Sequence, residues 1–113
     1  MDIQAIERER AAWRERVLRA ELAAPRERRA ETARQLRQHL ALADKLAARV
    51  PTEEEMENLF LGSEQQHAAA GHYAALRREG ASHRQALALC CWWLDEAGLA
   101  WERELLAKLE ASL

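Results

Sequence analysis

Hydrophobic residues recur every three or four positions along most of this 113-residue chain, which is the spacing of one face of an α-helix. Three interruptions divide the pattern, and each contains proline or glycine, at residues 24–25, 50–52 and 80–82. Pro25 and Pro51 suit the start of a helix and keep the preceding residue out of helical geometry. The pattern therefore predicts four helical segments, over residues 2–24, 26–50, 53–79 and 83–112.

Two of the predicted helix starts carry capping signals of their own. Thr52 is followed three residues later by Glu55, and Ser82 by Gln85, which is the spacing of a capping box. Glutamates at 53–55 also place negative charge at the positive end of the helix dipole. These signals agree with the starts that the hydrophobic pattern predicts.

The first two segments share the spacing of a coiled-coil seam. Because the link between them is only a few residues long, residues 1–50 are predicted to form an antiparallel hairpin. Arg10 interrupts the first seam, and we interpret it as a residue that sets the register or extends its charged head to solvent. The seam positions are Ile3, Ile6, Arg10, Trp13, Val17, Ala20 and Ala24 in the first segment, and Ala33, Leu36, Leu40, Ala43, Ala47 and Val50 in the second.

The pattern as a whole predicts an all-α protein with one domain over residues 1–113, in which the helices of residues 51–113 complete the hairpin. We expect an antiparallel up-down-up-down bundle of four helices, or of five if Gly98 breaks the last segment. The composition agrees, because strong helix formers dominate and the residues that favour strands are scarce.

One stretch, residues 86–94, contains no polar side chain and is predicted to be a helix that is apolar on every face. Such a helix must be surrounded, either by its own fold or by another chain. Trp92 and Trp93 are adjacent, so on a helix they project about 100° apart and do not fill the same core position. We favour an interface over complete enclosure, because tryptophan is common among the residues that dominate binding. The predicted partner-binding residues are Leu89, Trp92, Trp93, Leu94 and Trp101.

These features lead us to expect a small non-enzymatic interaction protein, such as an adaptor, an inhibitor or a chaperone-like regulator. It is expected to dock a helical face on a partner protein or on a second copy, with a dimer as the expected oligomer. A second contact surface is predicted where the apolar stripe of the third segment lapses, at Ser63, Glu64 and His67.

The first alternative is nucleic-acid binding through an Arg-rich stretch of the second segment. Phosphate binding usually needs a basic excess on one face. Here glutamates interleave with the arginines and the net charge of the chain is −2, so a solvated helix flank is the favoured interpretation. The arginines concerned are Arg26, Arg28, Arg29, Arg34 and Arg37.

The second alternative is a metal-dependent enzyme. Glu64 and His67 form a Glu-x-x-His motif, the spacing that di-iron helical bundles use for metal ligands. Such a centre needs two of these motifs, and the sequence contains one. We therefore expect no catalytic residues, no metal site and no cofactor.

Charge is distributed unequally between the two halves of the chain. Residues 1–50 carry 12 basic and 8 acidic side chains, a net charge of +4, and residues 51–113 carry 5 and 11, a net charge of −6. Opposite signs favour packing of the two halves or head-to-tail association of copies. Arginine outnumbers lysine by 15 to 2, which is typical of GC-rich coding and indicates a bacterial or phage origin.

The sequence favours a cytoplasmic location. No stretch is apolar for long enough to span a bilayer, and the first residues lack the pattern of a signal peptide. Cys90 and Cys91 are adjacent and could bond to each other only with strain. We interpret them as reduced, buried small hydrophobic residues.

Overall fold

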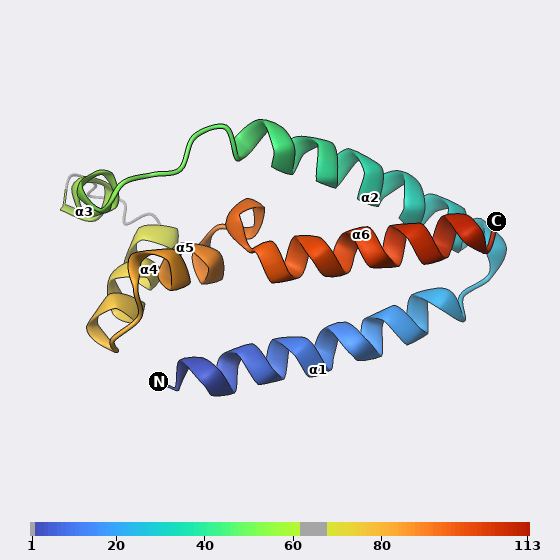
Figure 1. Ribbon diagram of the computed structural model, residues 1–113, viewed down its shortest axis with the longest axis horizontal. Coiled ribbons are helices and arrows are strands. Elements are labelled where there is room, and N and C mark those ends of the chain that lie inside the picture. Colours follow the sequence, from blue (N-terminus) through green and yellow to red (C-terminus); the bar gives the residue numbers. More distant parts are fainter. Residues whose placement is uncertain (1, 62–67) are drawn as a thin grey trace.

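The computed structural model describes residues 2–61 and 68–113, which form six α-helices and one 3₁₀ turn (Figure 1). These residues contain no strand, which confirms the predicted all-α class. The elements are α1 (Ile3–Leu22), α2 (Arg26–Leu46), α3 (Glu53–Leu61), α4 (Ala68–Arg78), α5 (His83–Cys90), η1 (Trp92–Leu94) and α6 (Glu96–Ala111).

The predicted helix starts are confirmed where capping residues specify them. Thr52 lies just before α3, and its Oγ1 accepts a hydrogen bond of 3.1 Å from the backbone N–H of Glu55 in the first turn. Ser82 and Gln85 form the complete capping box at the start of α5, with distances of 2.9 and 3.1 Å. Pro25 directly precedes α2, in keeping with its fixed φ and missing N–H.

The structure does not confirm a count of four or five helices. The predicted segment 53–79 contains α3 and α4, and the predicted segment 83–112 contains α5, η1 and α6. The prediction of a break at Gly98 is wrong, because Gly98 lies within the first turn of α6. The last segment instead breaks at Cys91, whose backbone is extended at φ −116° and ψ 102°.

The prediction that residues 86–94 form a single helix, apolar all round, is also wrong. The run is divided between α5 and η1, and the chain changes direction at Cys91. Asp95 then begins α6, because its Oδ1 accepts a hydrogen bond from the backbone N–H of Gly98 at 3.1 Å. The two parts of the run therefore present their apolar side chains in different directions.

α6 lies between α1 and α2, parallel to α1 and antiparallel to α2 (Figure 1). The contact between α2 and α6 is the most extensive in the structure, and the contact between α1 and α2 is small. The predicted short connection is present, but coiled-coil packing of the hairpin is not confirmed. None of the seam residues of α1 is fully buried, and Trp13 is 54% exposed, whereas Leu18 outside the seam is buried.

Two hydrophobic cores replace the single central core of a four-helix bundle. The first joins α1, α2 and α6, and the second joins α3, α4 and α5. The radius of gyration is 16.4 Å, against about 13 Å for a compact domain of this length. The buried residues are Leu18, Ala33, Leu105 and Leu109 in the first core, and Met56, Tyr73, Leu76, Ala81, Ala86, Leu87 and Cys91 in the second.

Replacing Leu105 by alanine tests the first core. Leu105 is 2% exposed, so Leu105→Ala is expected to lower the free energy of unfolding by about 2–5 kcal/mol. The matched control is Leu42→Ala, because Leu42 is 47% exposed and its truncation is expected to change stability by less than about 0.5 kcal/mol. Urea denaturation followed by circular dichroism measures both, and equal losses would contradict the described core.

Candidate functional site

A groove of about 800 Å³ opens between α1, the end of α2, α5, η1 and the start of α6. Ala47 and Val50 line it on the α2 side, and Arg10 and Arg14 line it on the α1 side. Its size falls within the range of about 300–1,000 Å³ that is usual for binding sites. The other apolar side chains that line it include Leu87, Leu89, Trp93, Leu94 and Leu99.

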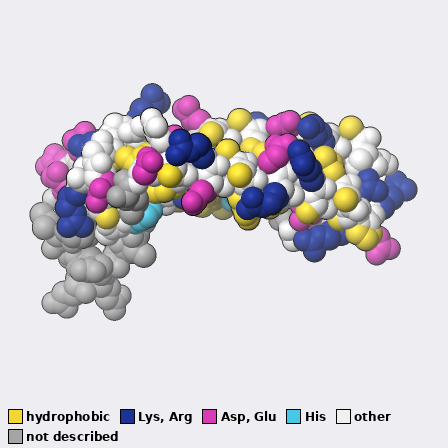
Figure 2. Space-filling view, turned by 90° about the horizontal axis from the view of Figure 1, so that it is seen from below, with side chains coloured by type: hydrophobic (Ala, Val, Ile, Leu, Met, Phe, Trp, Pro, Cys, Tyr) yellow, Lys and Arg dark blue, Asp and Glu magenta, His cyan; other side chains and the backbone are white. Residues whose placement is uncertain are grey.

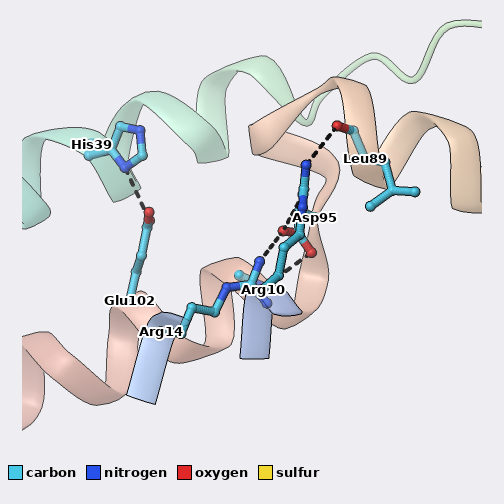
Figure 3. Close-up of polar contacts among 7 residues, drawn as sticks. Arg10, Arg14, His39, Leu89, Asp95 and Glu102 are labelled. Carbon is cyan, nitrogen blue, oxygen red and sulfur yellow. Dashed lines mark hydrogen bonds and ion pairs between the residues drawn. The ribbon is translucent and has the colours of Figure 1, made fainter. Parts of the chain in front are cut away.

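Two arginines of α1 contact the chain on either side of η1 (Figure 3). Arg14 Nη2 donates to Asp95 Oδ2 at 2.6 Å, and each of these side chains is 17% exposed. Arg10 Nη2 donates to the carbonyl of Leu89 at 3.3 Å, and Arg10 Nη1 lies 4.0 Å from Asp95 Oδ2. We call Arg10, Arg14 and Asp95 the Asp95 cluster. Because Asp95 also caps α6, one carboxylate specifies both the start of that helix and the position of α1.

Trp92 packs against α2 rather than into the groove. Its ring stacks on His39 with a centroid distance of 3.8 Å and an interplanar angle of 17°. His39 Nδ1 also forms a hydrogen bond of 3.0 Å with Glu102 Oε2 on α6 (Figure 3). Trp93 contacts Trp92 edge-on, with the ring centroids 5.9 Å apart and an interplanar angle of 85°.

The structure brings together three of the five predicted partner-binding residues. Leu89, Trp93 and Leu94 all line the groove. Trp92 instead stacks on His39, and Trp101 packs against the first core, with its ring 6.4 Å from that of Trp13. The buried Nε1 of Trp101 has no hydrogen-bond partner among the residues described.

Apolar side chains also remain exposed beside the groove. Leu42 and Leu46 lie one turn apart on α2 and are 47% and 39% exposed. Val50, four residues further along the chain, is 54% exposed and lines the groove. Exposed apolar side chains therefore lie both in the groove and on the last turns of α2. The repeat of apolar residues at a spacing of four is the signal in the sequence that indicates this surface.

The arginines of the nucleic-acid alternative are engaged in contacts within the chain. On the face that Figure 2 shows, basic and acidic side chains are interspersed. Fewer guanidinium groups are therefore available for phosphate than the sequence suggests. Arg26 donates to the Leu113 carbonyl, Arg28 to Glu21, Arg29 to Ala24 and Ser112, Arg34 to Glu31, and Arg37 to Glu110.

The second predicted contact surface, at Ser63, Glu64 and His67, lies outside the residues that the structure describes, and so does the Glu64–His67 motif. Within residues 2–61 and 68–113, no three His, Cys, Asp or Glu side chains are placed to hold a metal ion. None of the described helices combines the length and the apolar character needed to cross a membrane.

Asp95 is the residue of the site that the sequence-based prediction missed. Its signal was available, because an aspartate followed by an acidic residue such as Glu96 in the first turn is typical of a helix start. The contact between Asp95 and Arg14 had no such signal, because 81 residues separate the two. Arg10, interpreted from the sequence as a register-setting or solvent-reaching residue, bonds the backbone of α5.

Comparison with known proteins gives no relative from which a function could be transferred. No family model matches the chain, and neither the curated proteins nor the solved structures provide a match. The function is therefore argued from the groove and its surroundings.

The two adjacent cysteines are free thiols next to the groove. Burial raises the pKa of the Cys90 thiol to about 11, with a further contribution from the neighbouring Cys91. Burial also raises the pKa of Cys91, which is 5% exposed. Both thiols therefore stay protonated at neutral pH, where the thiolate is the reactive form.

Alkylation by iodoacetamide tests this environment. Near pH 8, about 1 in 1,000 Cys90 side chains is a thiolate in the folded protein, against about 1 in 4 for an ordinary thiol. We expect alkylation of Cys90, followed by mass spectrometry, to be at least about 100-fold slower in buffer than in urea. Equal rates in the two conditions would contradict the raised pKa.

The same shift predicts how stability depends on pH. The pKa of Cys90 is higher in the folded state, so the unfolded chain loses its thiol proton first as the pH rises. The contribution of the Cys90 thiol to the free energy of unfolding is fully present below about pH 8.5 and is lost as the pH rises from there to about 11. Denaturation of the wild type and of Cys90→Ala across this range measures it, and parallel pH profiles would contradict it.

Proposed function

We propose that the protein is a non-enzymatic interaction protein, acting as an adaptor, an inhibitor or a chaperone-like regulator. In this proposal a helix of a partner protein binds in the groove between α1, α2 and η1. The observation that carries the proposal is the group of apolar side chains in the lining of the groove, which includes the 54% exposed Val50. Exposed apolar surfaces of this kind are typical of interaction sites.

The volume of the groove is comparable to that of a short helical segment. Two turns of helix, about 11 Å long and about 10 Å across, occupy close to the 800 Å³ that the groove offers. A helix bound in a groove uses apolar anchors at positions i, i+3 or i+4, and i+7. The lining offers Trp93, Leu94 and Val50 as contacts for such anchors, and the arginines and acidic residues of the rim as polar contacts.

Among the described residues, Tyr73 and His83 form a partly buried polar pair that links three segments of the chain. The Tyr73 hydroxyl lies 2.8 Å from His83 Nδ1, and His83 Nε2 lies 2.9 Å from the carbonyl of Pro51. Because a carbonyl only accepts, Nε2 carries the proton and Nδ1 accepts from the hydroxyl. Burial raises the pKa of Tyr73, so its hydroxyl stays neutral. The pair thus joins α4, α5 and the chain before α3.

Site-specific photo-crosslinking tests the proposed surface. A benzophenone side chain at position 50 is expected to form an adduct with the partner in lysate of the native host, because Val50 is exposed and lines the groove. The matched control is the same side chain at Ala41, which is exposed and lies about 140° around α2 from Leu46. An adduct of twice the chain mass identifies a second copy as the partner.

Binding measurements on the captured partner complete the test. Val50→Arg is expected to weaken binding at least tenfold, because a guanidinium replaces an apolar contact in the groove. Ala41→Arg is expected to leave the affinity unchanged. Equal crosslinking from positions 50 and 41, or equal affinities of the two arginine variants, would overturn the proposal.

A further inference from the structure

α1 forms one wall of the groove and is the least buried of the three long helices. It has one buried residue, Leu18, against two in α2 and three in α6. Its contacts with α2 and α6 are also much smaller than the contact between those two helices. Elements with few buried apolar contacts open at a lower free energy than the rest of a protein.

The C-terminal end of α1 is attached firmly to α2. Glu21 accepts hydrogen bonds from Arg28 at 3.2 Å and from Thr32 at 3.1 Å. Arg29 Nε donates to the carbonyl of Ala24 in the connection, at 3.0 Å. Pro25 prevents α1 from continuing into α2 as one helix, because it lacks the N–H and its ring clashes with the preceding turn. This connection is therefore the point about which α1 can rotate.

Ahead of Leu18, both polar and partly buried apolar contacts hold α1 in position, and the ring of Trp13 lies 6.4 Å from that of Trp101 on α6. The Asp95 cluster sets Arg14 and Arg10 on the chain around η1, with the 2.6 Å bond from Arg14 as its shortest contact. Among apolar contacts, Ile3 packs against the second core without being fully buried. Two guanidinium groups share this carboxylate, so its loss would leave two like charges facing each other on adjacent turns.

We propose that α1 is a hinged cover of the first core, held closed by the Asp95 cluster. When the cluster separates, α1 turns about residues 23–25 and its packing on Leu105 and Leu109 through Leu18 loosens, while the bonds of Glu21 hold its C-terminal end to α2. Opening also removes the groove wall that contains Arg10 and Arg14. Binding of a partner helix against this wall is thereby coupled to closure of α1. The coupling rests on the proposed function, but the opening itself does not.

The two roles of Asp95 can be separated by substitution. Arg14→Gln removes the charge that binds Asp95 and leaves the cap of α6 intact. Asp95→Ser keeps a side chain that caps a helix but removes the charge that binds both arginines. Arg10→Gln is expected to have a smaller effect, because the contacts of Arg10 are longer, at 3.3 and 4.0 Å. The control is Arg16→Gln, at an exposed position of the same helix.

Hydrogen exchange of the full chain, followed by mass spectrometry, tests the hinged cover without any partner. In the wild type, amides of α1 are expected to exchange faster than those of α6. Arg14→Gln and Asp95→Ser are expected to raise exchange in α1 at least tenfold, and to leave α4 and α5 unchanged. Arg16→Gln is expected to leave α1 unchanged as well.

Two results would overturn the hinged cover. One is exchange of α1 and α6 at a common rate in the wild type, which would show that α1 opens only with the whole fold. The other is an equal effect of Arg14→Gln and Arg16→Gln on α1. The exchange experiment contains no partner, so it decides only whether α1 opens on its own. The crosslinking experiment decides only whether a partner binds in the groove, so either hypothesis can fail without the other.

Discussion

The Asp95 carboxylate is the contact on which the arrangement of the long helices depends. One of its oxygens caps α6 at the Gly98 N–H, and the other accepts from Arg14 of α1. The cap begins a new helix directly after an apolar run, so the chain turns at η1 and α6 returns between α1 and α2. A continuous helix through this point would carry its apolar residues away from both cores.

Charge pairing within the chain accounts for much of how the two halves associate. Among the described residues, several ion pairs join basic residues before position 50 to acidic residues after it. Most of these pairs are exposed, and each contributes about 0–1 kcal/mol to stability. Together they favour one register and one orientation of the helices of one half against those of the other. The ion pairs of the described residues that join the halves are Arg10–Asp95, Arg14–Asp95, Arg37–Glu110, Arg103–Asp44 and Arg49–Glu55, and a hydrogen bond joins His39 to Glu102.

The groove is a consequence of having two small cores instead of one. Each core is closed by short contacts among its own three helices, and η1 with the N-terminal half of α1 bridges them. Side chains at the junction, such as Trp93 and Val50, are left partly exposed because neither core is large enough to enclose them. The same junction carries the Asp95 cluster, so binding in the groove and the position of α1 share one set of residues.

The sequence by itself determined the all-α class and the helix starts at Arg26, Glu53 and His83, because prolines, glycines and caps act on residues within one turn. It also indicated that Trp93 is part of a contact surface, which remains a proposal. Only the tertiary structure decided that α6 separates α1 from α2 and that Asp95 meets Arg14. Periodicity identifies which face of a helix is apolar, but the partner of that face depends on contacts between residues far apart in the chain.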